Sequence, residues 1–453
     1  MRRRLPLALA FALSLYGQDS TDQSALMKQI LQRLDGLEKQ NQELLQTVNS
    51  LRQEVAASRS EAAKPIPEGN KPDEASQEDR LAVQEHRTAE QAQTKVEAAH
   101  KFPVQLDGIL LFNAFANSAT SAAEYFGNYN LLSGPGRDGA TFRQTLLGLN
   151  FQGPQLPGDG RVNGFISMDF YGGTSDPLYS RFRIRRAGIS LDWANRSFSV
   201  GQDKPLISPY QPDSLAEVGV PSLAGAGNLW LWLPQARYEE RHKLGTNTGF
   251  KAQLAVLQTE ETYASVPSSI ASTLEPARPA FEGRLAWWRQ IDDTRRFEFA
   301  PGFHVSTSHV GGNSVNSRIG SFDWLVIPAS HLQFSGTVFK GENVAALGAL
   351  GNGFAISRAG AFHPVNATGG WAQLAFPITP RLSLNIFSGI EDDHSSFLNR
   401  YSIVHNWTYA SNIMYHLGPN VVVSMEALQM RTRTFADVGA IQNHYDLAFG
   451  YLF

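Results

Sequence analysis

The sequence has no cysteine, few charged residues and no long apolar run beyond its first residues. With no cysteine, no disulfide can form, so stability must come from packing and hydrogen bonding. After residue 17 no stretch approaches the roughly 18 apolar residues of a membrane-spanning helix. Charged residues make up 18% and the net charge is −3. A nearly neutral chain of this kind argues against a nucleic-acid partner.

Recognisable catalytic motifs are also missing. The chain lacks HExxH, the phosphate-cradling GxxxxGK[ST] and GxSxG patterns, and its 11 histidines are dispersed. We therefore expect no enzyme activity, no catalytic residue, no metal site and no cofactor.

The first hundred residues predict three segments. Arginines 2–4 followed by an apolar run to Tyr16 indicate a secretory signal peptide over 1–17. Residues 20–57 carry heptads that predict a coiled coil, and residues 58–101, rich in proline and charge, predict a flexible tether. The oligomerisation contacts expected from heptad positions a and d include Leu34, Leu37, Asn41, Leu44, Val48 and Leu51.

The coil leaves its own assembly state open. An asparagine at position a favours a parallel dimer, whereas leucines at position e, Leu31 and Leu45, widen the stripe and favour a trimer, which we prefer. A single amphipathic helix packed on the following domain is the alternative.

Residues 102–453 have the texture of β-structure. The last eleven, NHYDLAFGYLF, alternate apolar and polar side chains with a period of two and end on Phe453, as closing strands of outer-membrane barrels do. The predicted strands are sixteen in number: 104–117, 141–152, 161–171, 181–192, 196–203, 229–240, 248–258, 280–290, 296–308, 315–327, 331–342, 368–377, 381–391, 402–416, 420–432 and 442–453.

Connection lengths test this interpretation. Short connections such as 193–195 and 417–419 alternate with longer ones such as 118–140, 204–228, 259–279 and 343–367, as periplasmic turns and outer loops do. The predicted fold is all-β: a 16-stranded antiparallel transmembrane barrel with an N-terminal α-helical coiled coil. It would lie in outer-membrane lipid with the coil in the periplasm. A pair of soluble β-sandwiches or a propeller would need a second layer over each apolar face.

Sixteen strands leave room for an aqueous lumen. Arg181, Arg183 and Arg185 alternate with apolar residues, so they predict an anion-attracting ladder on the lumen wall. Pairing of these arginines with acids such as Glu282 or Asp169, which would merely shape the pore, is the alternative. A bulge is expected near 187–188. Further cations proposed for the pore wall are Lys204, Lys251, Arg284 and Arg318.

The connection 204–228 stands where a third outer loop would be, rich in proline and glycine. If it folds inward, Lys204, Tyr210, Asp213 and Glu217 are candidates for a constriction. The alternatives are an ordinary surface loop or a loop packed on a neighbouring subunit.

The heptad segment QRLDGLEKQNQELLQTVNSLRQEV, the tether and a barrel ending in YLF resemble the trimeric DcaP-like porins. The stretch RFRIRRAGISLDWANRSFSVGQDKPLISP is similar to their arginine-bearing strand and the strand before the constriction loop. Phosphate-selective porins are similar in outline. The resemblance implies a homotrimer that passes small hydrophilic, anionic solutes, dicarboxylate- or phosphate-like, by diffusion.

Two rival functions remain at this point. One is an envelope-tethering protein whose coil binds peptidoglycan or a periplasmic partner. The other is a barrel enzyme such as a lipid hydrolase.

Overall fold

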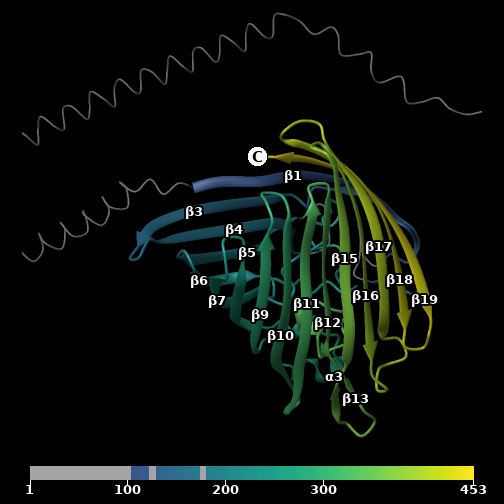
Figure 1. The fold of residues 1–453 in the computed structure, drawn as a ribbon. Coiled ribbons are helices and arrows are strands. Elements are labelled where there is room, and N and C mark those ends of the chain that lie inside the picture. The colour runs from purple at the N-terminus through teal and green to yellow at the C-terminus, as the bar shows by residue number, and fades with distance from the viewer. Residues whose placement is uncertain (1–103, 122–128, 174–179) are drawn as a thin grey trace, which may run out of the picture. The chain divides into compact units, whose positions relative to one another are not determined.

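The computed structural model describes residues 104–121, 129–173 and 180–453 (Figure 1). The predicted signal peptide, coiled coil and tether, and with them the heptad contacts, lie outside the described residues.

Most of the described chain forms one closed antiparallel sheet, and a separate pair of short strands lies in one of the connections. The strands of the closed sheet are β1 (Val104–Asn117), β2 (Arg137–Thr141), β3 (Leu146–Leu156), β4 (Gly160–Gly172), β5 (Arg181–Asp192), β6 (Arg196–Asp203), β7 (Leu233–Lys243), β8 (Thr248–Gln258), β9 (Pro279–Gln290), β10 (Arg296–Val310), β11 (Asn313–Ala329), β12 (Leu332–Glu342), β15 (Asn366–Thr379), β16 (Leu382–His394), β17 (Ile403–His416), β18 (Val421–Thr434) and β19 (Gly439–Leu452).

The barrel has sixteen strand positions, because two of the seventeen strands share one position. β2 and β3 pair with the two halves of β1, so together they form a single interrupted strand. The other edge of β1 pairs with β19, from Ile109 opposite Leu452 to Asn117 opposite His444, which closes the ring. The predicted sixteen-stranded antiparallel barrel is confirmed.

The burial pattern is the reverse of that of a soluble protein. In β19, Tyr445 is 57% exposed on the outer face, whereas Asp446 is 6% exposed and His444 fully buried toward the interior. β10 behaves alike: Phe303 points outward and His304 is buried. An apolar outer face over a polar interior is what a barrel spanning a lipid bilayer requires. In the described part of the chain, the helices are too short or too polar to span a membrane.

Long connections gather at one end of the barrel. Their described parts are 118–121 with 129–136, 204–232, 259–278 and 343–365, and they hold η1 (Glu261–Tyr263), α3 (Ser268–Ala271), η2 (Ala345–Leu347), β13 (Phe354–Ile356) and β14 (Phe362–Pro364). β13 lies at the opposite end from the C-terminus (Figure 1). We call the end with the long connections the loop end. Short turns lie there too, at 435–438 and at Gly311 and Gly312, whose φ values of 57° and 76° suit glycine.

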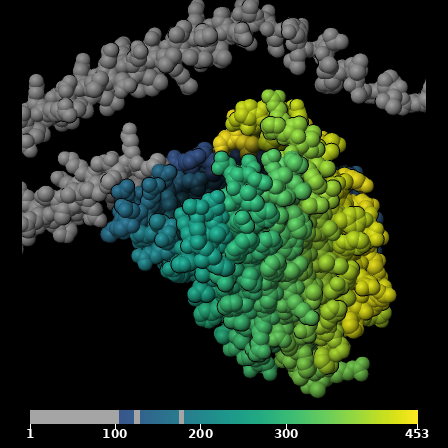
Figure 2. All heavy atoms as spheres, in the orientation of Figure 1, coloured from purple at the N-terminus to yellow at the C-terminus, as the bar shows by residue number. Residues whose placement is uncertain are grey.

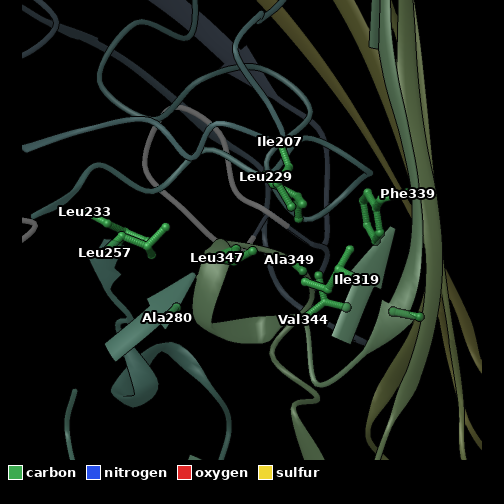
Figure 3. Close-up of a cluster of buried hydrophobic side chains, with 11 residues drawn as sticks. Ile207, Leu229, Leu233, Leu257, Ala280, Ile319, Phe339, Val344, Leu347 and Ala349 are labelled. Atoms are coloured by element: carbon green, nitrogen blue, oxygen red, sulfur yellow. The ribbon is translucent and has the colours of Figure 1, made fainter. Parts of the chain in front are cut away.

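A hydrophobic cluster lies within the barrel (Figure 3). Ile207 and Leu229 from the connection 204–232 pack with Leu347 from the connection 343–365. The run 229–232, predicted as the beginning of a strand, belongs to this connection instead, and β7 begins at Leu233. Its apolar side chains pack inside the barrel rather than against lipid. An alternating pattern in the sequence does not distinguish these two environments.

Candidate functional site

The connection 204–232, here called the inward loop, folds into the barrel. Asn113 on β1 donates to the Leu215 carbonyl oxygen at 2.8 Å, and Asn406 on β17 donates to the Gly225 carbonyl oxygen at 2.9 Å. Arg183 on β5 donates to the Gly219 carbonyl oxygen at 2.6 Å. Because these partners come from different sides of the ring, the loop crosses the lumen and narrows it.

Carboxylates of the wall hold the same loop by its hydrogen-bond donors. Glu282 accepts from the Leu206 amide at 2.6 Å, and Glu426 accepts from the Ser214 hydroxyl at 2.6 Å. Glu391 accepts from the Gly227 amide at 3.3 Å and, through its other oxygen, from the Leu350 amide at 2.8 Å. Glu391 therefore ties together the two connections that enter the barrel.

Beside the inward loop lies a cavity of about 650 Å³, which we call the basic cavity. Two carboxylates, Asp203 and Glu298, line it. The cationic side chains that line it are Arg185, Arg186, Lys204, Arg237, Lys251, Arg284 and Arg296. The field inside such a cavity favours anions.

Asp203, at the end of β6, is shared by two arginines. Arg186 pairs with it at 2.5 Å and Arg237 at 3.5 Å. Nearly half of the Arg186 side chain remains exposed, so its guanidinium is available to solutes in the cavity.

Glu298 and Asp323 serve three more cations. Arg284, only 1% exposed at its side chain, lies 2.6 Å from Asp323 and 2.9 Å from Glu298. Lys251 and Arg296 approach Glu298 at 3.3 Å and 2.5 Å. Arg284 is thus a buried structural charge, whereas Arg296 is partly exposed.

The predicted arginine ladder is divided by the structure. Arg183 and Arg185 point inward and share Asp169 at 2.6 Å and 3.6 Å. The alternative of pairing with Asp169 is therefore observed, while Glu282 binds the inward loop and His304 instead. Arg181 is exposed at the start of β5 and is absent from the cavity lining.

A bulge in β5 explains why Arg186 also reaches the cavity. Ser167 pairs with Arg186 and the next residue, Met168, pairs with Ile184, so Arg185 has no partner in β4. The bulge lies at Arg185 and not near 187–188 as predicted. An extra residue in one strand lets two successive side chains face the same side.

Trp232 of the inward loop covers part of this arginine cluster. Its ring lies 4.5 Å from the Arg185 guanidinium carbon and 5.4 Å from that of Arg183. These distances are those of cation–π contacts, which hold an arginine in place without neutralising it.

The four loop candidates separate into two groups. Lys204 and Tyr210 line the basic cavity. Asp213 exchanges hydrogen bonds with Gln373, and Glu217 is buried away from the cavity.

Burial dominates the electrostatics of this loop. It lowers the pKa of the Lys204 ammonium to about 7, with the charge of Arg186 adding to the shift. Burial also raises the pKa of Asp213, and raises that of Glu217 well above its usual range with help from Glu426.

Arg318 was wrongly predicted to face the lumen. It is exposed on the outward side of β11, in the same alternation as Phe322. Conversely, Arg237 and Arg296 were overlooked, although Tyr238 and Phe297 beside them mark the outward parity of their strands. Trp232 carried no such signal because it precedes its strand.

Within residues 104–121, 129–173 and 180–453, the structure brings together no group of three or more His, Asp or Glu side chains that could hold a metal ion.

A closed barrel of sixteen strands with an inward loop is the fold of outer-membrane porins. The outer membrane channel DcaP of Acinetobacter baumannii superposes with a TM-score of 0.65 at 16% identity, over 77% of this chain and 97% of that one. An anion-selective porin from Comamonas acidovorans gives a TM-score of 0.53 at 13% identity, over 78% and 100%. No family model and no curated protein sequence matches the chain. The predicted resemblance to DcaP-like porins is confirmed in the fold.

Proposed function

We propose that the chain is an outer-membrane porin that passes small hydrophilic anions by diffusion through the basic cavity. The observation that carries this proposal is the excess of cationic side chains around the cavity. Seven cations line it. Six of them, all but Lys204, are in ion pairs with four carboxylates, Asp169, Asp203, Glu298 and Asp323, and Arg183 shares Asp169 among the described residues.

Shared carboxylates cannot neutralise this wall. Two unit charges 4 Å apart interact by about 1 kcal/mol in water and about 4 kcal/mol near a protein surface. Uncompensated cations at the narrow part of a lumen therefore favour anions severalfold, with singly or doubly charged carboxylates and phosphates as candidate solutes. No covalent step is involved, and selection depends on field and width.

The remaining predictions belong to the same proposal. We propose a homotrimer embedded in outer-membrane lipid, with the N-terminal coiled coil in the periplasm, where peptidoglycan is a candidate contact. The outward apolar face supports the membrane placement, and the inward loop supports a channel with a constriction.

Single-channel recording of the purified full-length protein in a planar bilayer tests the proposal. Under a salt gradient we expect a reversal potential on the anion-selective side, and current steps in groups of three for a trimer. Cation selectivity would refute the role of the basic cavity. Folded protein that gives no steps would refute the channel.

A further inference from the structure

The outward face of the barrel is apolar around most of the ring but carries a row of polar side chains over β12 to β18. Register places Lys340 opposite Thr368, Thr368 opposite Asp392, Asp392 opposite His405 and His405 opposite Arg433. We call these five residues the polar row. They lie near the loop end of their strands.

A groove of about 770 Å³ lies along the same strands and reaches the polar row at Lys340, Thr368 and Asp392. Its walls are apolar, and small outward residues, Gly320 and Ala372, leave it open. Figure 2 shows the outward face of these strands. The large outward-facing side chains that line the groove are Phe322, Trp324, Val338, Ile390 and Trp407.

Positive charge is in excess at the row. Lys340 is exposed and has no carboxylate partner within the described residues. The Asp392 carboxylate, the one acid in the row, lies 2.5 Å from the His405 ring nitrogen. Arg433 reaches only Asp437, at 3.4 Å and in solvent.

Arg431 lies on the outward face two residues before Arg433 and is held in a fixed position. It donates to Gln429 at 2.8 Å and to the Tyr409 hydroxyl at 3.1 Å, and its guanidinium carbon lies 5.4 Å from the Trp407 ring. None of these partners is a carboxylate. The guanidinium is therefore oriented but not neutralised.

Cations on the lipid side of a barrel are costly at the membrane midplane, about 2–4 kcal/mol, and tolerated near the interface. An apolar groove bounded by Lys340 and, beyond Trp407, by Arg431, two cations without a carboxylate partner among the described residues, matches a ligand with an acyl chain and an anionic headgroup. We propose that the groove and the polar row bind an anionic lipid whose headgroup carries more than one phosphate. The proposal rests on the membrane placement given under the proposed function.

Spacing supports a headgroup with two phosphates. Lys340 and Arg433 stand four strands apart in the row, about 19 Å between backbones at the usual strand spacing. Both side chains are long, but one phosphate cannot reach both. A wide headgroup with a phosphate toward each end satisfies Lys340 and the Arg431–Arg433 pair together.

A lipid suits the site better than a second copy of the chain. Two rigid barrels need broad, complementary faces of roughly 800 Å² each, whereas this surface is hollow. Flexible acyl chains fill a hollow, and phosphates neutralise cations that a protein face would leave desolvated.

Native mass spectrometry of the full-length protein tests the proposal after incubation with vesicles containing a bisphosphorylated, acylated lipid. The same lipid with its phosphates removed serves as the comparison. Wild-type protein is expected to retain the phosphorylated lipid and not the dephosphorylated one. The double variant Lys340→Gln/Arg431→Gln is expected to retain about tenfold less of the phosphorylated lipid. The control Arg289→Gln removes an exposed cation at the end of β9 that lies away from the loop end, and it is expected to retain as much as wild type.

A second variant tests the groove itself. Ala372→Trp fills the groove from an outward position and is expected to reduce lipid retention while leaving conductance unchanged. Equal retention by all proteins would overturn the proposal. So would an Ala372→Trp protein with normal lipid but fewer subunits, which would make the groove a subunit contact. If wild-type protein retained the phosphorylated lipid but gave no channel activity, the proposed porin function would be refuted and the lipid-binding site would not.

Discussion

The two halves of the lumen wall differ in net charge and in whether the inward loop covers them. On one half, cations of β5 and β7 to β10 face the basic cavity. On the other, Glu391, Glu426 and Asp446 of β16, β18 and β19 are buried under the inward loop. We call these halves the basic wall and the acidic wall.

Hydrogen-bond chemistry explains this division. Unpaired amides and hydroxyls of a loop are donors, and an ionised carboxylate is an acceptor only. Glu391 and Glu426 therefore dock the loop, whereas guanidinium groups on the basic wall are held mainly by carboxylates and leave open space beside them. The acidic wall is structural, and the basic wall is available to solutes.

Arg284 offers the strongest way to test the basic wall. Arg284→Ala leaves Asp323 and Glu298 without their buried partner, so the free energy of unfolding should fall by about 3–5 kcal/mol. Urea titration of the detergent-solubilised barrel, followed by tryptophan fluorescence, measures this.

Two controls accompany that variant. Arg296→Gln removes a partly exposed charge whose partner, Glu298, keeps Arg284 and Lys251, so its cost should stay below about 1 kcal/mol. Arg284→Ala/Asp323→Asn should recover part of the loss. Equal stabilities of Arg284→Ala and Arg296→Gln would mean that Arg284 is hydrated rather than buried.

Glu391 is the corresponding residue on the acidic wall. Glu391→Ala removes the acceptor for both Gly227 and Leu350, and each unpaired buried amide costs about 1–3 kcal/mol. The inward connections should then detach, and single-channel recording should find a larger conductance with more noise.

Glu391→Gln separates hydrogen bonding from charge at this position. Its amide keeps one acceptor oxygen, so its conductance should lie between those of Glu391→Ala and wild type. Conductance identical in all three would show that other contacts alone hold the loop.

Charge selectivity is where the two walls should differ most clearly. Arg186→Gln/Arg296→Gln removes two partly exposed cations while Asp203 keeps Arg237 and Glu298 keeps Arg284. Anion preference, read from the reversal potential, should fall severalfold. Glu426→Gln should change it little, because the inward loop covers that residue. A larger shift from Glu426→Gln would place the solute path on the acidic wall.

The strands could be predicted because apolar and polar side chains alternate within each strand, independently of the other strands. β5, β6 and β8 begin and end at the predicted residues, since apolar outward and polar inward positions define both face and length. The run 229–232 could not be assigned, because an apolar segment inside the lumen and one facing lipid have the same composition.

The candidate site was harder to predict because its residues come from distant strands. Arg185 was predicted from the alternation of β5 and Lys251 was proposed for the pore wall, but Arg186 reaches the cavity only through the bulge at Arg185. The acidic wall was not predicted, because the role of Glu391 and Glu426 depends on their hydrogen bonds to the inward loop, which the sequence does not reveal. Which carboxylate pairs with which cation depends on closure of the ring.

Lys204 should add a small pH dependence to the basic wall. Burial lowers its pKa to about 7, so it is charged below that pH and neutral above it, while the arginines stay charged throughout. Anion preference should therefore decline modestly from pH 6 to pH 8, and Lys204→Met should show the pH 8 value at both. The lowered pKa of Lys204 also makes the stability of the folded state depend on pH. Between pH 7 and about 10.4, the ordinary lysine value, the unfolded chain holds a proton that the folded chain lacks, so this group makes the folded state more stable as pH rises. A preference that rises with pH in wild type would show that Lys204 does not face the solute.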